Sequence, residues 1–536
     1  MKQKKLLLIG MFFSWVFFGC TNLDENVYSE ISENNFYNSK LEIYESAMYP
    51  FTYMYDWLAW SNEYSYFYHN ELSADQLAWP QKGRHGYDRG EHIRAHYHTW
   101  TTDERRIGLM WGAMYKDIGY TNFAISNLST VNVASVDMTT EEMESLIAEL
   151  KVYRAFIHMK LMDMFGNIPI STDVTSVNIP TVERTEVFNW VESEILNNID
   201  KLQLASENLV GRVTKVVAYA MLTELYLNAE EWTGTARWNE CITYCDQIIS
   251  GEGGAQTGSL QLDENVLGPF NNTNHLSSEN IYEVPFSFDN GFSKNWSGIL
   301  MGFSNMSSAL NVNYSGNNAF VVIPTAFDMF EEQDYRKQQW FLFGPQYEYG
   351  TTTPILGSEE YLGEPFIYVN NIRRNSEGQT GEGGMTDGEE NSGARFHKYR
   401  SGTAADANYL ENDFVVYRLT EIYFSKAEAI MRANGGMPTQ EAVDLINESK
   451  SRYFSSTDFI SSAYTINSLT LNELLNERGR EFIFEGKRRT DLIRFGKFTT
   501  TSWWDKSPDG GNYLKLMPIP ADQIAANPNL IQNTGY

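Results

Sequence analysis

Helical periodicity over two long stretches is the feature that most limits what this chain can fold into. Apolar residues recur every three or four positions in RRIGLMWGAMYKDIGYTNFAISNL (105–128), EEMESLIAELKVYRAFIHMKLMDMF (141–165) and LNELLNERGREFIFEGKRRTDLIRFGK (471–497). This spacing places apolar side chains on one face of a helix. We therefore predict a mostly α-helical fold, and the same pattern predicts further helices at 40–58, 186–202, 213–230, 238–249, 417–435 and 438–454.

Local signals add detail to this prediction. Thr140, followed by two glutamates, is the predicted N-cap of the helix at 141–165. The helices at 213–230 and 238–249 are joined by a short loop and resemble a tetratricopeptide-type hairpin, which buries its apolar face by stacking on neighbours. Cys241 and Cys245 lie four positions apart in the second of these helices. We interpret them as small buried side chains, because adjacent helical turns rarely provide disulfide geometry.

The middle of the chain has a different composition. Residues 251–413 are rich in Gly, Asn, Ser and Pro, with short extended pieces such as NIYEVPFSF (280–288) and PFIYVN (365–370). This composition predicts a loop-rich insertion with a few short strands, and the run at 375–393 is predicted to be a disordered loop. Loops carried on a rigid scaffold are where binding residues tend to lie, so the insertion is the expected ligand-binding face.

The start of the chain has the pattern of an export signal. Three lysines precede an apolar run of 13 residues, Leu6 to Phe18, which falls short of the roughly 20 residues that span a bilayer. The following Gly-Cys resembles a bacterial lipoprotein box with Cys20 as the lipidated residue, and a plain signal peptide with a chance cysteine is the alternative. The chain then divides into a signal peptide (1–19), a lipidated tether (20–40), an N-terminal helical region (41–250), the loop-rich insertion (251–413) and a C-terminal helical region (414–536).

The charge balance excludes one class of ligand. The 536 residues include 69 acidic and 41 basic side chains, a formal net charge of −28. Loss of residues 1–19, which contain three lysines and no acid, changes this to −31. A chain this acidic is not expected to bind nucleic acid. No second apolar run approaches the length of a membrane span.

Several stretches in a fixed order resemble the SusD/RagB family of outer-membrane nutrient-binding lipoproteins. The C-terminal part supplies RLTEIYFSKAEAIMR (418–432), RGREFIFEGKRRTDLIRFGK (478–497) and PIPADQIAANPNLIQNTGY (518–536). The N-terminal part supplies ELSADQLAWP (71–80), MWGAMYKDIGYTNFAI (110–125) and YRAFIHMKLMDMFGNIPI (153–170). The resemblance implies a SusD-like fold, with tetratricopeptide-type helical pairs as scaffold and a loop-rich ligand-binding face.

The resemblance also implies a function. Such a protein captures a polysaccharide or oligosaccharide at the cell surface and delivers it to a SusC-type TonB-dependent transporter in the outer membrane, without catalysis. We expect a neutral glycan, no cofactor and no metal, and contact with the membrane through the lipid anchor alone. Two alternatives stay open, a glycoside hydrolase and a helical-repeat scaffold that binds only protein partners.

Aromatic residues in two stretches are the candidate glycan-binding residues. Trp79 stands directly before Pro80, which favours extended backbone and a displayed indole, and Arg84, His85 and Tyr87 follow closely. The alternative is a tryptophan buried beneath the loop. In the insertion, the candidates are Asp289, Asn295, Trp296 and Tyr314.

Two other groups of residues are weaker candidates for a catalytic or a metal-binding site. Glu481 and Glu485 are four residues apart, the spacing of two carboxylates on one helix face, as an acid and a base would need. Cations such as Arg488, Arg489 and Arg494 lower carboxylate pKa values, so an ion-pair network is the favoured interpretation. His92 and His96 have the spacing of two metal ligands on a helix, but the two glycines nearby make a helix doubtful there, and structural histidines are expected.

Overall fold

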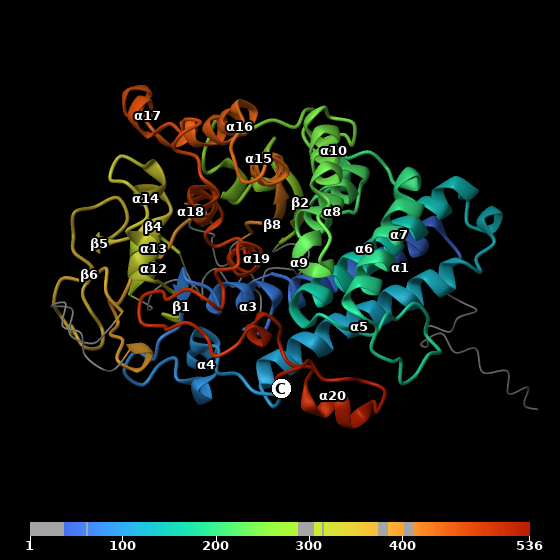
Figure 1. The fold of residues 1–536 in the computed structure, drawn as a ribbon, viewed down its shortest axis with the longest axis horizontal. Helices are drawn as coiled ribbons and strands as arrows, with labels where there is room; N and C mark the ends of the chain where they lie inside the picture. The colour runs from blue at the N-terminus through green and yellow to red at the C-terminus, as the bar shows by residue number, and fades with distance from the viewer. Residues whose placement is uncertain (1–36, 60–62, 288–304, 313–315, 373–383, 401–410) are drawn as a thin grey trace, which may run out of the picture.

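The computed structural model describes residues 37–59, 63–287, 305–312, 316–372, 384–400 and 411–536, and Figure 1 shows their arrangement. The N-terminal region contains α1 (Lys40–Met48), α2 (Met54–Trp57), α3 (Tyr66–Leu72), α4 (Glu91–Tyr97), α5 (Arg105–Leu128), α6 (Thr140–Phe165), α7 (Arg184–Asn198), α8 (Lys215–Leu227), α9 (Ala229–Thr233) and α10 (Trp238–Ile249). The middle region contains α12 (Met306–Leu310), α13 (Pro324–Phe327) and α14 (Tyr335–Gln339). The C-terminal region contains α15 (Leu419–Ala433), α16 (Gln440–Lys450), α17 (Ser456–Ser462), α18 (Leu471–Phe482), α19 (Arg488–Arg494) and α20 (Ala521–Ala526).

The strands are short and pair only in twos within the described part of the chain. They are β1 (Leu77–Ala78), β2 (Asn280–Val284), β3 (Val321–Val322), β4 (Phe341–Leu342), β5 (Gly344–Pro345), β6 (Ile367–Tyr368), β7 (Arg395–Phe396) and β8 (Phe414–Arg418). Antiparallel pairs form between β1 and β3, β2 and β8, β4 and β7, and β5 and β6. The predicted mostly α-helical fold with a few short strands is therefore confirmed.

Helix boundaries follow the periodicity except where the backbone interrupts it. Helices α5 and α10 cover the predicted segments. The N-cap of α6 is Thr139 and not Thr140, because Thr139 and Glu142 form a capping box. The predicted helix at 40–58 breaks at Pro50, whose ring removes a backbone donor. The predicted helix at 471–497 is also two helices, α18 and α19, separated at Phe484, which has a φ of 68°.

A layer of successive helices joins the N-terminal and C-terminal regions. Helix α10 packs against both α8 and α15, and α15 packs in turn against α16 (Figure 1). Cys241 and Cys245 of α10 are buried and free, and the Cys241 thiol lies 3.6 Å from the carbonyl oxygen of Thr223 on α8. The interpretation of these cysteines as small packing side chains is confirmed. The main apolar core includes residues of all three regions.

The middle region is more ordered than its composition indicates. Residues 375–383 lie outside the described part, but 384–393 are placed, and the prediction of disorder is wrong for them. Glu390 is fully buried, and its carboxylate accepts hydrogen bonds from the backbone N–H groups of Ser358, Glu359 and Tyr361 at 2.9–3.1 Å. A buried carboxylate that holds three N–H groups fixes the loop that contains it.

The placed helices do not meet the requirements of a membrane span. Over the described ranges, none combines the length and the apolar character that crossing a bilayer requires. The predicted signal peptide (1–19), the lipidation site Cys20 and most of the tether lie outside the described residues.

Candidate functional site

A cavity of about 320 Å³ opens beside the end of β1. It draws its walls from three segments of the chain. The lining residues are Glu63, Trp79, His85, Gly86, Asp88, Gly316 and Asn317. We call this cavity the β1 pocket. Four of its residues come from the stretch 79–88, where the sequence predicted binding, and two come from the insertion, close to Tyr314.

Trp79 is the floor of the β1 pocket and is not a displayed platform. Only 5% of the residue is exposed, and its indole stacks on the His92 ring at a centroid distance of 3.9 Å and an angle of 10°. Gly86, with a φ of +77°, covers the indole so closely that a Cβ there would lie 2.9 Å from Trp79 Nε1. The expectation of a displayed indole is therefore wrong, because the loop 80–87 folds back over the ring.

Arg84 and Tyr87 lie on the loop beside the β1 pocket, directly before and after the lining residues His85 and Gly86. Tyr87 is 53% exposed, the most open aromatic side chain among the candidates that the structure places. Arg84 is exposed, and its guanidinium donates to Glu359 Oε1 at 3.4 Å and to His85 Nε2 at 3.3 Å. The loop 80–87 is thereby held against the insertion. Tyr87 offers an exposed stacking surface next to the pocket, and Arg84 carries hydrogen-bond donors on the same loop.

A polar triad of buried Tyr68, buried His92 and half-exposed Asp88 supports the floor. The Tyr68 hydroxyl lies 2.6 Å from His92 Nδ1, and His92 Nε2 lies 2.9 Å from Asp88 Oδ2. Burial lowers the pKa of His92, so the ring is neutral at neutral pH. Both contacts then fit one tautomer, in which Tyr68 donates to Nδ1 and Nε2–H donates to Asp88. The hydrogen bond from His92 in turn lowers the pKa of the Asp88 carboxyl.

The histidine-rich stretch does form a helix, contrary to the doubt raised by its glycines, since residues 91–97 are α4. Its histidines do not converge. His92 faces Asp88 while His96 lies 2.8 Å from Asp505 Oδ1, and His98 of the next turn lies 2.7 Å from Asp509 Oδ2. All three are buried and hydrogen bonded. His96 and His98 therefore hold this stretch against the C-terminal region, whereas His92 holds the loop to α3.

One trio in the described ranges has ligand atoms close enough to share a cation. Ligand atoms of Glu63, Asp88 and His92 all lie within 4.8 Å of one another. Each of the three already has a protein partner, however. Arg106 forms an ion pair with Glu63, and Tyr68 and Asp88 occupy the two nitrogens of His92. The trio is therefore satisfied by its own contacts.

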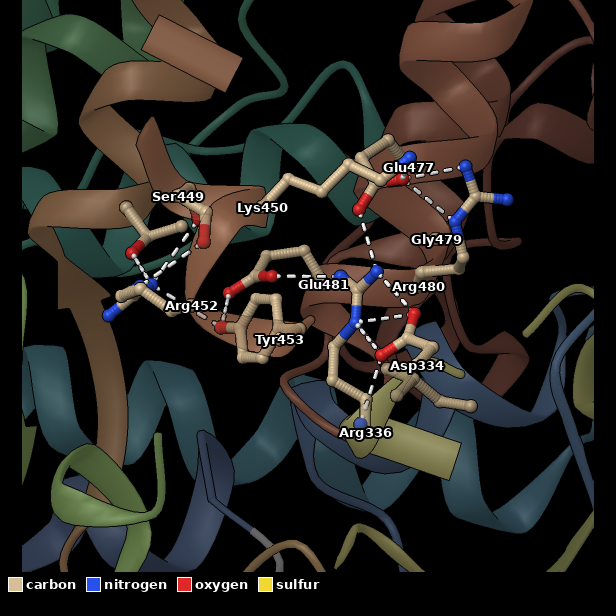
Figure 2. Close-up of polar contacts among 12 residues, drawn as sticks. Asp334, Arg336, Ser449, Lys450, Arg452, Tyr453, Glu477, Gly479, Arg480 and Glu481 are labelled. Atoms are coloured by element: carbon tan, nitrogen blue, oxygen red, sulfur yellow. Dashed lines mark hydrogen bonds and ion pairs between the residues drawn. The ribbon is translucent and has the colours of Figure 1, made fainter. Parts of the chain in front are cut away.

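The carboxylates Glu481 and Glu485 belong to a buried ion-pair network. Figure 2 shows Arg336 reaching Asp334, Glu477 and Glu481, at distances of 2.7, 2.8 and 3.1 Å. Glu481 also accepts a hydrogen bond from the Tyr453 hydroxyl at 2.8 Å (Figure 2).

Glu485 forms ion pairs with two other cations, Lys398 at 2.6 Å and Arg418 at 2.8 Å. Burial opposes its charge, yet Arg418 and Lys398 outweigh that penalty and lower the pKa of the Glu485 carboxyl. A carboxyl with a lowered pKa is a poor general acid near neutral pH.

The cations that neutralise this pair are not those adjacent in sequence. Arg488 binds Asp75, Arg489 binds Asp163, and Arg494 binds Glu428 and Asp491. Arg336 and Arg418, which do bind Glu481, lie 145 and 63 residues away along the chain. The ion-pair interpretation was correct in kind and wrong about the partners, because α18 ends at Phe482 and turns Glu485 out of the helix.

Half of the predicted binding residues cannot be placed. Asp289, Asn295, Trp296 and Tyr314 lie outside the described residues. Sequence reasoning missed Glu63, Asp88 and Asn317 in the β1 pocket. Asp88 and Asn317 each stand within three residues of a predicted binding residue, so a wider window around the candidates would have included them. Nothing in the sequence near Glu63 indicates its position.

A helical scaffold with a loop-lined pocket of aromatic and polar side chains is the architecture of a ligand-binding protein. The chain belongs to the SusD family. The family described as "SusD family" matches residues 269–536, and the one described as "Starch-binding associating with outer membrane" matches residues 22–227.

Individual relatives agree with this assignment. The starch-binding protein SusD of Bacteroides thetaiotaomicron is 25% identical over 500 residues, which cover 87% of this chain and 84% of that protein. A laminarin-binding SusD-like protein superposes with a TM-score of 0.69 at 19% identity, over 93% of this chain and all of that chain. Surface glycan-binding protein A from Bacteroides thetaiotaomicron, solved with laminarihexaose, superposes with a TM-score of 0.70 at 18% identity, over 92% of this chain and 99% of that one.

Proposed function

We propose that this protein captures a neutral polysaccharide or oligosaccharide at the outer surface of the cell and delivers it, uncleaved, to a SusC-type TonB-dependent transporter. The observation that carries the proposal is the similarity, over most of the chain, to a relative named for starch binding. The solved neighbours named for laminarin and laminarihexaose share the fold. The export signal and Cys20 support a lipid anchor at the outer membrane.

The geometry of the β1 pocket agrees with a sugar ligand. Tyr87 presents a half-exposed ring, and flat aromatic faces stack on sugar rings while the polar groups around them bind hydroxyls. Asp88 and Asn317 of the lining, and Arg84 on the adjoining loop, supply such polar groups. The pocket volume of about 320 Å³ is at the small end of the range for ligand sites, as expected for binding part of a longer chain.

The rival glycoside hydrolase has no support from the carboxylates that suggested it. Glu481 is fully buried and Glu485 is 3% exposed, and cations hold both, so no substrate reaches them. Turnover of laminarin or starch by the purified protein would support this rival. A scaffold that binds only protein would show retention by the transporter without affinity for any glycan.

The test is affinity electrophoresis of residues 21–536 through gels that contain laminarin or soluble starch. We expect retardation in at least one of them. It should weaken in Tyr87→Ala and Arg84→Ala, and in Trp296→Ala, since that tryptophan is the predicted second platform. Tyr335→Ala is the matched control, because Tyr335 is 41% exposed on α14 and lines no cavity described above. Unchanged retardation in all three variants would refute the site, and migration unaffected by either glycan would count against the function.

A further inference from the structure

A larger groove lies between α1, α5 and the segment 171–176, on a part of the molecule that the proposed function does not use. Its volume is about 910 Å³, within the range of small-molecule sites. It shares no lining residue with the β1 pocket. We call it the α1–α5 groove.

Open aromatic rings line this groove. Tyr49 is 49% exposed and Phe123 is 50% exposed, and both belong to its lining. Between them, Tyr120 packs edge-on against Tyr49 at a centroid distance of 5.2 Å and an angle of 79°. This contact and the hydrogen bond that Tyr53 donates to the Tyr120 hydroxyl at 3.3 Å hold Tyr49 and Tyr120 in place. Rings that are fixed yet half exposed lose little conformational entropy when a ligand stacks on them.

Fixed polar groups surround the rings. The Asn127 amide donates to the Tyr37 hydroxyl at 3.0 Å, at one end of the groove. Asp173 stands opposite, and its carboxylate accepts the backbone N–H groups of Thr175 and Ser176, each at 2.8 Å. Lys116 places its ammonium 5.0 Å from the Tyr53 ring centroid. Aromatic faces beside carboxylate, amide and ammonium groups match the alternating apolar faces and hydroxyl rims of sugar rings.

A glycine inside the long helix α5 forms part of the groove wall. Gly119 lines the groove, and a Cβ added there would meet nothing within 4 Å. A side chain at this position would therefore project into the open space that a ligand would fill. Gly112 lies two turns earlier on α5, also has nothing within 4 Å of a Cβ, and does not line the groove. The two glycines form a matched pair for an experiment.

We propose that the α1–α5 groove is a second binding site for a neutral oligosaccharide, distinct from the β1 pocket. This inference rests on the proposed function, because it assumes that a glycan is the natural ligand. Two separated sites on one chain would grip two parts of a polysaccharide, so that each raises the effective concentration at the other. The competing occupant is the leading segment 21–36, which ends next to Tyr37 at the rim.

The experiment compares Gly119→Ala, Phe123→Ala and the control Gly112→Ala by affinity electrophoresis in laminarin and in soluble starch. Alanine favours a helix interior over glycine, so both glycine variants should keep or raise the melting temperature. We expect Phe123→Ala to weaken retardation by roughly threefold to tenfold, the effect of losing one stacked ring. Gly119→Ala should also weaken it, because the added methyl group enters the space of the ligand, with no change in Gly112→Ala. Combining Phe123→Ala with Tyr87→Ala should weaken retardation further than either alone.

Other outcomes would overturn the proposal, and they separate it from the proposed function. If the unaltered chain is retarded and both groove variants are retarded equally, the groove site is wrong while glycan binding stands. If no chain is retarded by either polysaccharide, the function fails and the groove site fails with it. If Phe123→Ala lowers the melting temperature of 21–536 but not of 37–536, and retardation is unchanged, the leading segment fills the groove.

Discussion

Replacing Arg336 with methionine would test whether the network in Figure 2 holds the C-terminal helices to the rest of the molecule. The guanidinium is fully buried and lies against three carboxylates, those of Asp334, Glu477 and Glu481, whose side chains are at most 1% exposed. It also lies 4.4 Å from the Tyr453 ring centroid. Methionine keeps much of the length of the side chain but supplies no charge, so the carboxylates stay buried with fewer cations.

The size of the expected loss in the free energy of unfolding follows from the burial of these groups. Removing one partner of a buried ion pair costs about 3–5 kcal/mol, because the remaining charge is left without compensation. Here Glu477 keeps Arg480 at 2.6 Å and Glu481 keeps Arg418 at 2.9 Å, so the two glutamates retain some compensation. We therefore expect the free energy of unfolding at pH 7 to fall by about 3 kcal/mol, the lower end of that range.

The effect should depend on pH in a defined direction. Burial raises and Arg336 lowers the pKa of the Glu477 carboxyl, and the net direction is down. A lowered pKa contributes stability that is present above the ordinary glutamate pKa and lost as pH falls below it. In Arg336→Met, Glu477 protonates more readily, so the destabilisation should be smaller near pH 4.5 than at pH 7.

The assay is urea unfolding of the unaltered chain and the variant at both pH values. A lower midpoint with an unchanged slope reports a change in stability alone. The control is Lys201→Met, which removes a surface ion pair with Glu144 whose side chains are about half exposed and should leave the midpoint unchanged. A loss below about 1 kcal/mol at pH 7, the size of a surface pair, would refute the reasoning. An equal loss at both pH values would refute the electrostatic origin.

Three further predictions concern other buried groups. Burial raises the pKa of Asp117 to about 8. Between about pH 4 and pH 8 the free energy that this side chain contributes to stability should therefore fall by about 1.4 kcal/mol for each unit of pH increase. Thermal unfolding curves taken across this range should show a flatter dependence on pH in Asp117→Asn. Trp79→Ala should lower the free energy of unfolding by about 3–5 kcal/mol in urea, since it empties the floor beneath the loop, whereas a displayed indole would cost almost nothing. Cys241 and Cys245 should react with a thiol reagent only after urea unfolding, and reducing agents should leave the melting temperature unchanged, because both thiols are buried and unlinked.

Much of the scaffold follows from the sequence, because helix formation depends on neighbours three and four positions away. Helices α5 and α10 begin and end where the apolar spacing does, and the cysteines of α10 face inward as their spacing indicates. Helix interruptions were harder to see. Pro50 is a visible signal, whereas the only local sign of the turn at Phe484 is Gly486, a glycine with a φ of 70° inside an otherwise helical pattern.

In the candidate site, too, some features could be predicted from local sequence and others depended on tertiary contacts. The sequence located the loop that carries Arg84, His85 and Tyr87, because turn residues and aromatic residues gather there. The burial of Trp79 was decided by tertiary structure, since it depends on how His92 and Gly86 enclose the indole.

The apolar spacing by itself determined the helical scaffold, while the loop-rich insertion and the export signal stay predictions from local composition and pattern. Only the tertiary structure decided which cations neutralise Glu481, which indole is covered, and that α1, α5 and the segment 171–176 enclose a groove. The physical reason is that these features depend on groups brought together from distant positions. Helix periodicity concerns one turn of backbone, whereas Arg336 and Glu481 meet across 145 residues of chain.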